Sequence, residues 1–367
     1  MKKVSLIAIL ALVLIVAACG GNGASNNTPA TPNQPEQNNT NTNGNEPAKP
    51  EEEEPVTGKI TVYVAFHEDH AVAALKKFTE ETGIEADMIR MASGEILAKV
   101  RAEQNNPQAD VWYGGPAETH VAAMQENLLQ PYKSPVAEAI PQEFRDPDGY
   151  WTGVYIGPIG FASNKEFLDK HNLQPPSSWD DLLDPAYKGE VVMAHPGSSG
   201  TAYTILYSII KAKGGDEAGF QFMEKLHPQI QQYTTSGGAG GRMAGMGEAA
   251  VGILFAHDII KYQKEGFDNL VMSSPSDGTG LEIGGVGIIN NAPNLAGAKK
   301  FIDWASGPSA QEVGQTKDSF QILTHPDAQQ PKEAIDLSQL NLVEMSPAEA
   351  GARRQEIIDR WDREINK

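Results

Sequence analysis

Three short stretches of glycine and hydroxyl residues each come directly before a predicted helix. They are Ala92-Ser93-Gly94, the segment from Gly197 to Thr201, and Thr235-Ser236-Gly237. The first N–H groups of a helix lack intrahelical partners and carry partial positive charge, so an anion can bind there. Hydroxyls add neutral donors, and glycine lets a ligand approach the backbone closely. Helix capping alone explains any one stretch, but three in one chain indicate a shared anion pocket.

A second group of polar residues follows or begins buried strands. His257 and Asp258 come directly after the apolar segment 250–256, and Glu282 begins a later strand. Open α/β sheets bind ligands at the carboxyl ends of their strands. Asp258 and Glu282 are able to accept hydrogen bonds from hydroxyls or an ammonium group, and His257 to donate one to a hydroxyl or phosphate. The alternative is that His257 and Asp258 only cap the helix that follows.

The sequence offers little for catalysis or metal binding. His67, Glu68 and His70 lie close together, but their spacing is not the His-Glu-x-x-His of zinc proteases, and a loop with a helix cap explains them better. There is no Gly-x-Ser-x-Gly elbow and no Walker-A ending, and Cys19 is the single cysteine. We therefore expect neither enzymatic activity nor a cofactor.

Arginine and aromatic candidates are fewer. Arg242, beside the third glycine-rich stretch, is a better candidate for pairing with an anion than Arg90 or Arg101. Trp112 and Tyr113 lie in an apolar strand pattern, so we expect them in the core rather than stacked on a ligand.

Strands and helices must alternate to position these residues. We expect strands over 59–66, 84–91, 110–115, 190–195, 250–256 and 282–289, and helices over 70–83, 93–103, 202–213, 296–306 and 347–365. Extended segments at 150–163 and 282–289 suggest strands that cross between two lobes. The alternation predicts an α/β fold with mostly parallel strands in each lobe.

Composition narrows the class of partner. The chain of 367 residues has a formal net charge of −19, which makes it a poor nucleic-acid binder. Its acidity does not exclude a small anionic ligand, because local donors decide that. The length of the folded region fits two lobes.

The N-terminal segment has the pattern of a bacterial lipoprotein signal. Lys2 and Lys3 precede an apolar run through residue 18, and small residues then lead to Cys19. We expect residues 1–18 to be a signal peptide and Cys19 to be lipidated, which holds the protein on the extracytoplasmic face of the cell membrane, periplasmic or Gram-positive. Residues 19–57 are rich in Asn, Pro, Thr and Glu and are predicted to be a disordered linker.

Several motifs, in this order and spacing, resemble the extracellular solute-binding proteins of ABC importers. The similarity is to the group that binds ferric ion, 2-aminoethylphosphonate and hexose phosphates. The motifs are Ser93-Gly94-Glu95, Asp110-Val-Trp-Tyr-Gly-Gly115, Ser198-Ser-Gly-Thr-Ala-Tyr203, Gly252-Ile-Leu-Phe-Ala-His-Asp258 and Asp277-Gly-Thr-Gly-Leu-Glu282. The resemblance implies a type II periplasmic-binding-protein fold with two lobes, two crossing strands and ligand in the cleft between them. The implied boundaries are 58–155 for the first part of lobe 1, 156–283 for lobe 2, and 284–367 for the return to lobe 1 and the C-terminal helices.

The resemblance also indicates the class of ligand. Ferric binders of this group use two adjacent tyrosines where this chain has His257 and Asp258, and the chain has no Tyr-Tyr pair. The organophosphate branch is therefore favoured. Carried over, the residues that would contact a phosphate or phosphonate are Ser93, Gly94, Ser199, Gly200, Thr201 and Ser236. Those that would contact the organic part are His257, Asp258 and Glu282.

The leading hypothesis is a lipid-anchored, monomeric substrate-binding component that delivers a small organophosphate or phosphonate to an ABC permease. The alternative is ferric-ion binding through His67, Glu68, Asp258 and scattered tyrosines. A third hypothesis, ranked last, is an ectoenzyme acting on phosphate esters. Presentation of the solute to a sensor kinase would use the same cleft.

Overall fold

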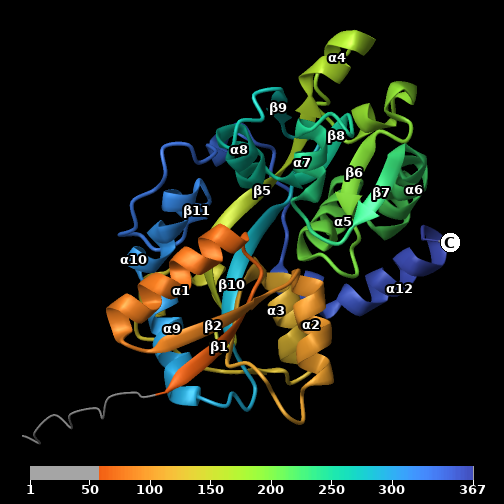
Figure 1. Ribbon diagram of the computed structural model, residues 1–367. Coiled ribbons are helices and arrows are strands. Elements are labelled where there is room, and N and C mark those ends of the chain that lie inside the picture. Colours follow the sequence, from red (N-terminus) through yellow and green to blue (C-terminus); the bar gives the residue numbers. More distant parts are fainter. Residues whose placement is uncertain (1–57, 367) are drawn as a thin grey trace, which may run out of the picture. The chain divides into compact units, whose positions relative to one another are not determined.

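Strands and helices alternate along the chain, as the sequence predicts (Figure 1). The computed structural model describes residues 58–366, so the predicted signal peptide, Cys19 and the linker lie outside the described residues. The strands are β1 (Lys59–Val64), β2 (Glu85–Arg90), β3 (Val111–Pro116), β4 (Leu129–Gln130), β5 (Thr152–Asn164), β6 (Val191–Ala194), β7 (Ile230–Thr234), β8 (Val251–Phe255), β9 (Leu270–Ser273), β10 (Leu281–Ile289) and β11 (Ile322–Leu323). The helices are α1 (Glu68–Thr82), α2 (Ser93–Ala102), α3 (Ala117–Gln125), α4 (Lys165–His171), α5 (Gly200–Ala212), α6 (Asp216–Leu226), α7 (Ala239–Gly245), α8 (Ala256–Lys264), α9 (Leu295–Ser306), α10 (Pro308–Gln311), α11 (Pro347–Ala352) and α12 (Arg354–Glu364).

Two mixed sheets organise these elements. The first has the strand order β2-β1-β3-β10-β5, with β4 paired to β10 and β11 paired to β5. The second has the order β7-β6-β8-β5, and β9 also pairs with β5. β1 runs parallel to β2 and β3, and β6 runs parallel to β7 and β8, whereas β5 and β10 run antiparallel to all their partners. Both sheets are therefore mixed, and the predicted parallel pairing holds only for the pairs that do not include β5 or β10.

β5 belongs to both sheets and so defines two lobes. Residues 152–158 pair with β10 in the first sheet, and residues 159–163 pair with β8 in the second. We call the first sheet with its helices lobe 1 and the second sheet with its helices lobe 2. β10 begins opposite Pro158 and returns the chain to lobe 1. The predicted boundaries at 155 and 283 both fall within these two strands, and they stay predictions.

Each lobe has an apolar core. In lobe 1, the rings of Phe78 and Phe301 lie 4.9 Å apart between centroids. Trp112 and Tyr113 are buried in the same lobe, as their strand pattern predicts. In lobe 2, Trp179 is fully buried with the helices around the second sheet. Aromatic burial of this kind contributes much of the stability of a core.

The C-terminal segment forms two helices where the sequence predicts one over 347–365. The break falls at Arg353, whose backbone has φ −95° and ψ 0°. Trp361 of α12 lies in the core of lobe 2. In α11, a Cβ atom at Gly351 would come within 2.5 Å of the Val121 side chain in α3 of lobe 1. The C-terminal helices therefore contact both lobes.

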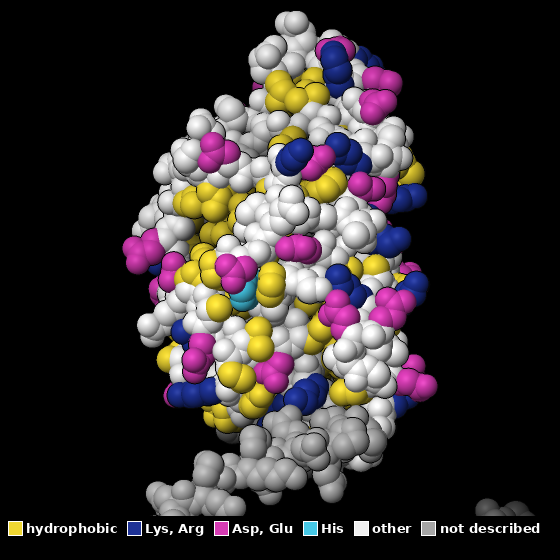
Figure 2. All heavy atoms as spheres, turned by 90° about the vertical axis from the view of Figure 1, so that its left-hand side faces the viewer, with side chains coloured by type: hydrophobic (Ala, Val, Ile, Leu, Met, Phe, Trp, Pro, Cys, Tyr) yellow, Lys and Arg dark blue, Asp and Glu magenta, His cyan; other side chains and the backbone are white. Residues whose placement is uncertain are grey.

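Charged side chains of both signs lie on the face of the molecule shown in Figure 2. Acidic and basic side chains are interspersed on the face shown in Figure 2, and no large basic region covers that face. This agrees with the acidic composition. Among residues 58–366, no helix combines the length and the apolar character needed to cross a bilayer.

Candidate functional site

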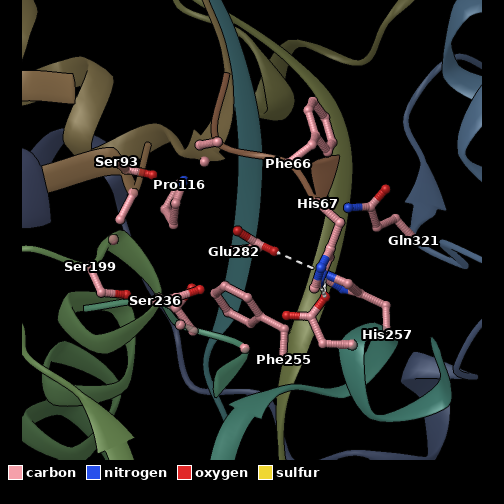
Figure 3. A pocket seen from close by; sticks show the side chains of 18 of the residues that line it. Phe66, His67, Ser93, Pro116, Ser199, Ser236, Phe255, His257, Glu282 and Gln321 are labelled. Atoms are coloured by element: carbon pink, nitrogen blue, oxygen red, sulfur yellow. Dashed lines mark hydrogen bonds and ion pairs between the residues drawn. The ribbon is translucent and has the colours of Figure 1, made fainter. Parts of the chain in front are cut away.

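A pocket lies between the two lobes, and residues of both lobes line it (Figure 3). Eight of the nine predicted contact residues are among them: Ser93, Ser199, Gly200, Thr201, Ser236, His257, Asp258 and Glu282. The other lining residues are Ala65, Phe66, His67, Arg90, Ala92, Gly115, Pro116, Tyr155, Gly237, Gly238, Phe255 and Gln321. The fold thus brings distant segments together around one chamber, while their contact with a ligand stays a prediction.

Gly94 is the predicted contact residue that is absent from the pocket lining. It lies in the first turn of α2, where a Cβ atom would come within 2.4 Å of the Gly197 carbonyl oxygen and 2.6 Å of the Ser198 carbonyl oxygen. The missing side chain lets the start of α2 in lobe 1 approach this loop of lobe 2. The structure therefore gives Gly94 a role in the contact between the lobes, which the sequence did not indicate.

Serine and threonine hydroxyls gather at one end of the pocket, which we call the hydroxyl end. Ser93, Ser199 and Ser236 lie on the same side of the chamber in Figure 3. Ser199 Oγ accepts a hydrogen bond from the Ala202 backbone N–H at 3.3 Å and so caps α5. Within residues 58–366, the hydroxyls of Ser93, Thr201 and Ser236 make no hydrogen bond. They are free to bind a ligand.

The helices α2 and α5 begin at the hydroxyl end. Ser93 is the first residue of α2, and Gly200 and Thr201 are the first residues of α5. The N–H groups of Gly200 and Thr201 lie in the first turn of α5 and so have no partner inside the helix. Ser199 Oγ caps the N–H of Ala202 and leaves these two available. Arg90 is the only Lys or Arg among the described residues that line the pocket. This end therefore offers mainly neutral donors and helix dipoles, which suit an anion.

The opposite end, which we call the polar end, contains an ion pair between the lobes. His67 Nε2 of lobe 1 lies 3.0 Å from Asp258 Oδ1 of lobe 2. Burial opposes ionisation of Asp258, but the charges of His257 and His67 and the hydrogen bond from His67 lower its pKa to about 2. Burial also opposes the charge on His67, yet Asp258 more than offsets this and raises the pKa of that histidine. Each of the two groups therefore favours the charged form of the other across the lobes.

His257 and Glu282 add two buried polar groups to the polar end. His257 Nε2 lies 3.5 Å from Asp258 Oδ1 and 3.6 Å from Glu282 Oε1. Burial lowers the pKa of His257, and burial together with the charge of Asp258 raises the pKa of Glu282 well above its ordinary value. His257 Nδ1 and Glu282 Oε1 have no hydrogen-bond partner among the described residues. Since unpaired buried polar atoms are costly, these two are suited to bind a ligand.

Aromatic rings form apolar walls between the two ends. The rings of Phe66 and Tyr155 lie 5.3 Å apart, and Phe255 stacks against His257 at 5.6 Å. Burial and the nearby Glu282 raise the pKa of Tyr155 well above its usual value, so its hydroxyl stays protonated. Apolar walls with a few polar groups are typical of pockets that hold an organic ligand.

Further polar contacts join the lobes beside the pocket. Lys261 Nζ of α8 donates to Asp69 Oδ2 of α1 at 2.7 Å. On α5, the Thr204 hydroxyl donates to the Glu118 carboxylate of α3. The lobes are thus in direct contact around the pocket.

The predicted arginine is not the one that reaches the site. Arg242 does not line the pocket, and its guanidinium lies 5.8 Å from the Phe267 ring centroid. Arg90 lines it instead, and its Nε donates to the Phe66 carbonyl at 3.1 Å. Arg101 pairs with Glu126 on the surface. The position of Arg90 at the end of a parallel strand is the signal that would have identified it.

The residues proposed for iron are only partly assembled. Glu68 is exposed and does not line the pocket, although His67 and Asp258 do. His70 is buried beside Phe66, with ring centroids 4.3 Å apart. Across residues 58–366, no group of three or more His, Cys, Asp or Glu side chains is arranged to hold a metal ion.

Two α/β lobes, linked by β5 and β10 and enclosing a pocket, define a type II periplasmic-binding-protein fold. Residues 106–334 match the model of the bacterial extracellular solute-binding protein family. The chain belongs to this family, as the sequence motifs predict.

Similar proteins include binders of different solutes. The periplasmic binding protein AfuA from Actinobacillus pleuropneumoniae, solved with exogenous fructose-6-phosphate bound, is 39% identical, with a TM-score of 0.81 and coverage of 84% of this chain and 98% of that one. The periplasmic binding protein P5PA is 32% identical, with a TM-score of 0.81 and coverage of 84% and 100%. Iron uptake protein A1 of a Synechocystis strain is 28% identical over 72% of this chain and 76% of its own.

Proposed function

We propose that this solute-binding component of an ABC importer is lipid-anchored and binds a phosphorylated sugar or polyol between its lobes. The observation that carries the proposal is the contrast within one pocket. Hydroxyls without a partner among the described residues and two helix starts lie at one end, and a paired carboxylate with further buried polar groups lies at the other. The phosphoryl group would bind at the hydroxyl end and the organic part at the polar end.

The hydroxyl end supports the phosphoryl position. A phosphate ester offers several acceptor oxygens, and Ser93, Thr201 and Ser236 have hydroxyls available to donate to them. The starts of α2 and α5 add backbone donors. The similarity to AfuA, which was solved with fructose-6-phosphate, favours the same class of ligand here.

The polar end favours hydroxyls over an ammonium group. The negative charge of Asp258 is already paired with His67, and burial together with the charge of Asp258 raises the pKa of Glu282, which disfavours its charged form. An ammonium group would therefore find less negative charge to pair with than two free carboxylates would offer. Sugar hydroxyls, in contrast, both donate and accept. We therefore expect sugar phosphates to bind more tightly than 2-aminoethylphosphonate.

Ferric ion is the second candidate because of the similarity to an iron uptake protein. A hard trivalent cation favours ionised oxygen ligands. Tyr155 is the only tyrosine among the described lining residues, and its raised pKa disfavours the phenolate form. Protein mixed with ferric ion should therefore show no charge-transfer absorption from iron-bound tyrosinate.

Isothermal titration calorimetry with four ligands tests the proposal. We expect fructose 6-phosphate to bind with a Kd in the micromolar range or below, about −8 kcal/mol or better. Glycerol 3-phosphate should bind more weakly, 2-aminoethylphosphonate more weakly still, and ferric ion not at all. Binding of ferric ion without any phosphate ester would overturn the proposal. Release of inorganic phosphate from the esters would show an enzyme instead of a binding protein.

The anchor has its own test. A Cys19→Ala variant should be lost from the membrane fraction, since the acyl chains would have no attachment site. Retention of the variant in that fraction would contradict lipid anchoring at Cys19.

We also propose that the protein is a monomer, and size-exclusion chromatography should show one.

A further inference from the structure

Gln321 lies at the polar end of the pocket. No sequence motif identifies this residue as a candidate ligand contact. It precedes β11 in lobe 1, shortly after the 3₁₀ helix η6 (Glu312–Lys317). Its side chain lines the chamber, although the residue is only 6% exposed. In Figure 3 its amide nitrogen points toward the side where His67 lies.

Ser319 fixes the orientation of this amide. Ser319 Oγ donates to Gln321 Oε1 at 3.1 Å. Ser319 is itself buried, and its backbone N–H donates to the Gly314 carbonyl at 3.0 Å. The amide oxygen is therefore engaged inside the protein. The amide nitrogen makes no hydrogen bond with residues 58–366 and remains as a donor toward the chamber.

Lobe 2 holds the segment that carries Gln321. Lys261 Nζ donates to the Lys317 carbonyl at 2.8 Å, and it also pairs with Asp69. Lys261 and Asp258 are three residues apart on α8, so they lie on the same face of that helix. When the lobes meet, α8 therefore brings Asp258 to the pocket and fixes the loop before Gln321.

A donor at this point complements its neighbours. Asp258 offers a carboxylate acceptor at the same end, and Glu282 Oε1 makes no hydrogen bond with the described residues. A ligand oxygen that donates to a carboxylate still accepts a hydrogen bond from an amide N–H. Inorganic phosphate lacks an organic part, so when it is bound at the hydroxyl end it would offer no oxygen to the Gln321 amide.

We propose that Gln321, oriented by Ser319, is a specificity-determining residue that donates a hydrogen bond to an oxygen of the organic part of the ligand. The proposal rests on the proposed function, in which a phosphorylated sugar or polyol occupies the pocket.

Calorimetry on Gln321→Ala tests this role, with Gln315→Ala as the matched control. Gln315 belongs to η6, and its amide donates to the Gln329 carbonyl instead of lining the pocket. Gln321→Ala should bind fructose 6-phosphate about tenfold more weakly and change inorganic phosphate binding less than twofold. Gln315→Ala should change neither by more than about twofold.

Three results would overturn the inference. The first is a change below twofold for fructose 6-phosphate in Gln321→Ala. The second is an equal loss for fructose 6-phosphate and inorganic phosphate, which would indicate a general disturbance of the pocket. The third is a wild-type protein that binds no phosphate ester, in which case the proposed function fails first and this role fails with it.

The positioning role of Ser319 is measured separately. Ser319→Ala should weaken fructose 6-phosphate binding about threefold to tenfold, and Ser319→Thr should restore it because the hydroxyl is kept. The double variant Ser319→Ala with Gln321→Ala should bind no more weakly than Gln321→Ala alone. Additive losses, or equal losses in the Ala and Thr variants, would contradict orientation of Gln321 by Ser319. The thermal midpoints of the ligand-free proteins report any loss of folding.

Discussion

The two ends of the pocket differ in how far their polar groups are satisfied before a ligand binds. At the hydroxyl end, Ser93, Thr201 and Ser236 have no partner within residues 58–366. At the polar end, Asp258 already pairs with His67 across the lobes. Both ends combine residues of the two lobes, but the first depends on helix starts and single hydroxyls, whereas the second contains an ion pair between the lobes. We infer that the hydroxyl end supplies affinity for the phosphoryl group and that the polar end couples recognition to closure.

The largest effect should come from removing the charge at the polar end. Asp258→Asn leaves His67 without its counter-ion and removes an acceptor for ligand hydroxyls. We expect a loss of about 3 kcal/mol in binding of fructose 6-phosphate, roughly a hundredfold in Kd. Calorimetry measures this loss, and Asp268→Asn, an exposed change in the same lobe, is the control.

Asp258 should also set the order of preference among ligands. The variant and the wild type are screened against sugar phosphates, glycerol phosphates and aminoalkylphosphonates. The ranking should differ between them because the proposed function places Asp258 against the organic part of the ligand. An identical ranking would show that the carboxylate has no part in choosing the solute.

The hydroxyl end should respond next, through a single side chain. Thr201→Val keeps the shape of the residue and removes its hydroxyl. Binding of fructose 6-phosphate should weaken by about 1–3 kcal/mol, because the proposed function has this hydroxyl donate to the charged phosphoryl group. Thr316→Val is the control, because the Thr316 hydroxyl donates to the Val313 carbonyl and Thr316 does not line the pocket. Unchanged affinity in Thr201→Val would remove Thr201 from the site.

Ser199 should behave differently from Thr201 although both line the hydroxyl end. Ser199 Oγ already caps α5. Ser199→Ala should therefore lower the free energy of unfolding by about 1 kcal/mol, measured by urea denaturation, with little change in affinity. A large loss of affinity with unchanged stability would make Ser199 a ligand contact instead of a cap.

The smallest expected effect is a pH dependence of stability at the polar end. The pKa of His67 is higher in the folded protein than its ordinary value of 6.5, so its pairing stabilises the fold fully below pH 6.5. That contribution is lost as the pH rises through the raised pKa. Asp258, with its pKa lowered to about 2, stays ionised throughout this range.

Comparison with His67→Gln isolates this contribution. The difference in unfolding free energy between wild type and variant should be larger at pH 6 than at pH 8.5. Burial and, to a smaller extent, the charge of His67 lower the pKa of His257, which destabilises the fold as the pH falls below 6.5; this opposing effect is present in both proteins and is smaller in the variant. A difference that grows with pH would contradict the ion pair.

The element order and eight of the residues that line the pocket could be predicted from the sequence. Strands such as 59–64 alternate apolar and polar residues, and Gly83, in the left-handed conformation at φ 74°, ends α1 as its position indicates. The Ser/Thr/Gly stretches identify the starts of α2 and α5 because capping chemistry is local. The ends of buried strands indicated His257 and Asp258 for the same reason.

The remaining features depend on packing between distant segments. Gly94 faces the 197–198 loop of the other lobe, and Arg242 turns to Phe267 instead of the pocket. Gln321 follows a 3₁₀ helix in a loop, where no periodic pattern indicates which way a side chain points. The break at Arg353 separates α11, where Gly351 packs against Val121 of lobe 1, from α12, where Trp361 lies in the core of lobe 2. Local patterns alone do not carry such information.

A crystal structure of the protein with fructose 6-phosphate is the most direct test of the central claim. We predict that phosphoryl oxygens lie within hydrogen-bond distance of Thr201 Oγ1 and Ser93 Oγ, and that sugar oxygens contact Asp258 and Gln321. A phosphoryl group beside His257 and Glu282, or a ligand bound outside the chamber, would contradict the account.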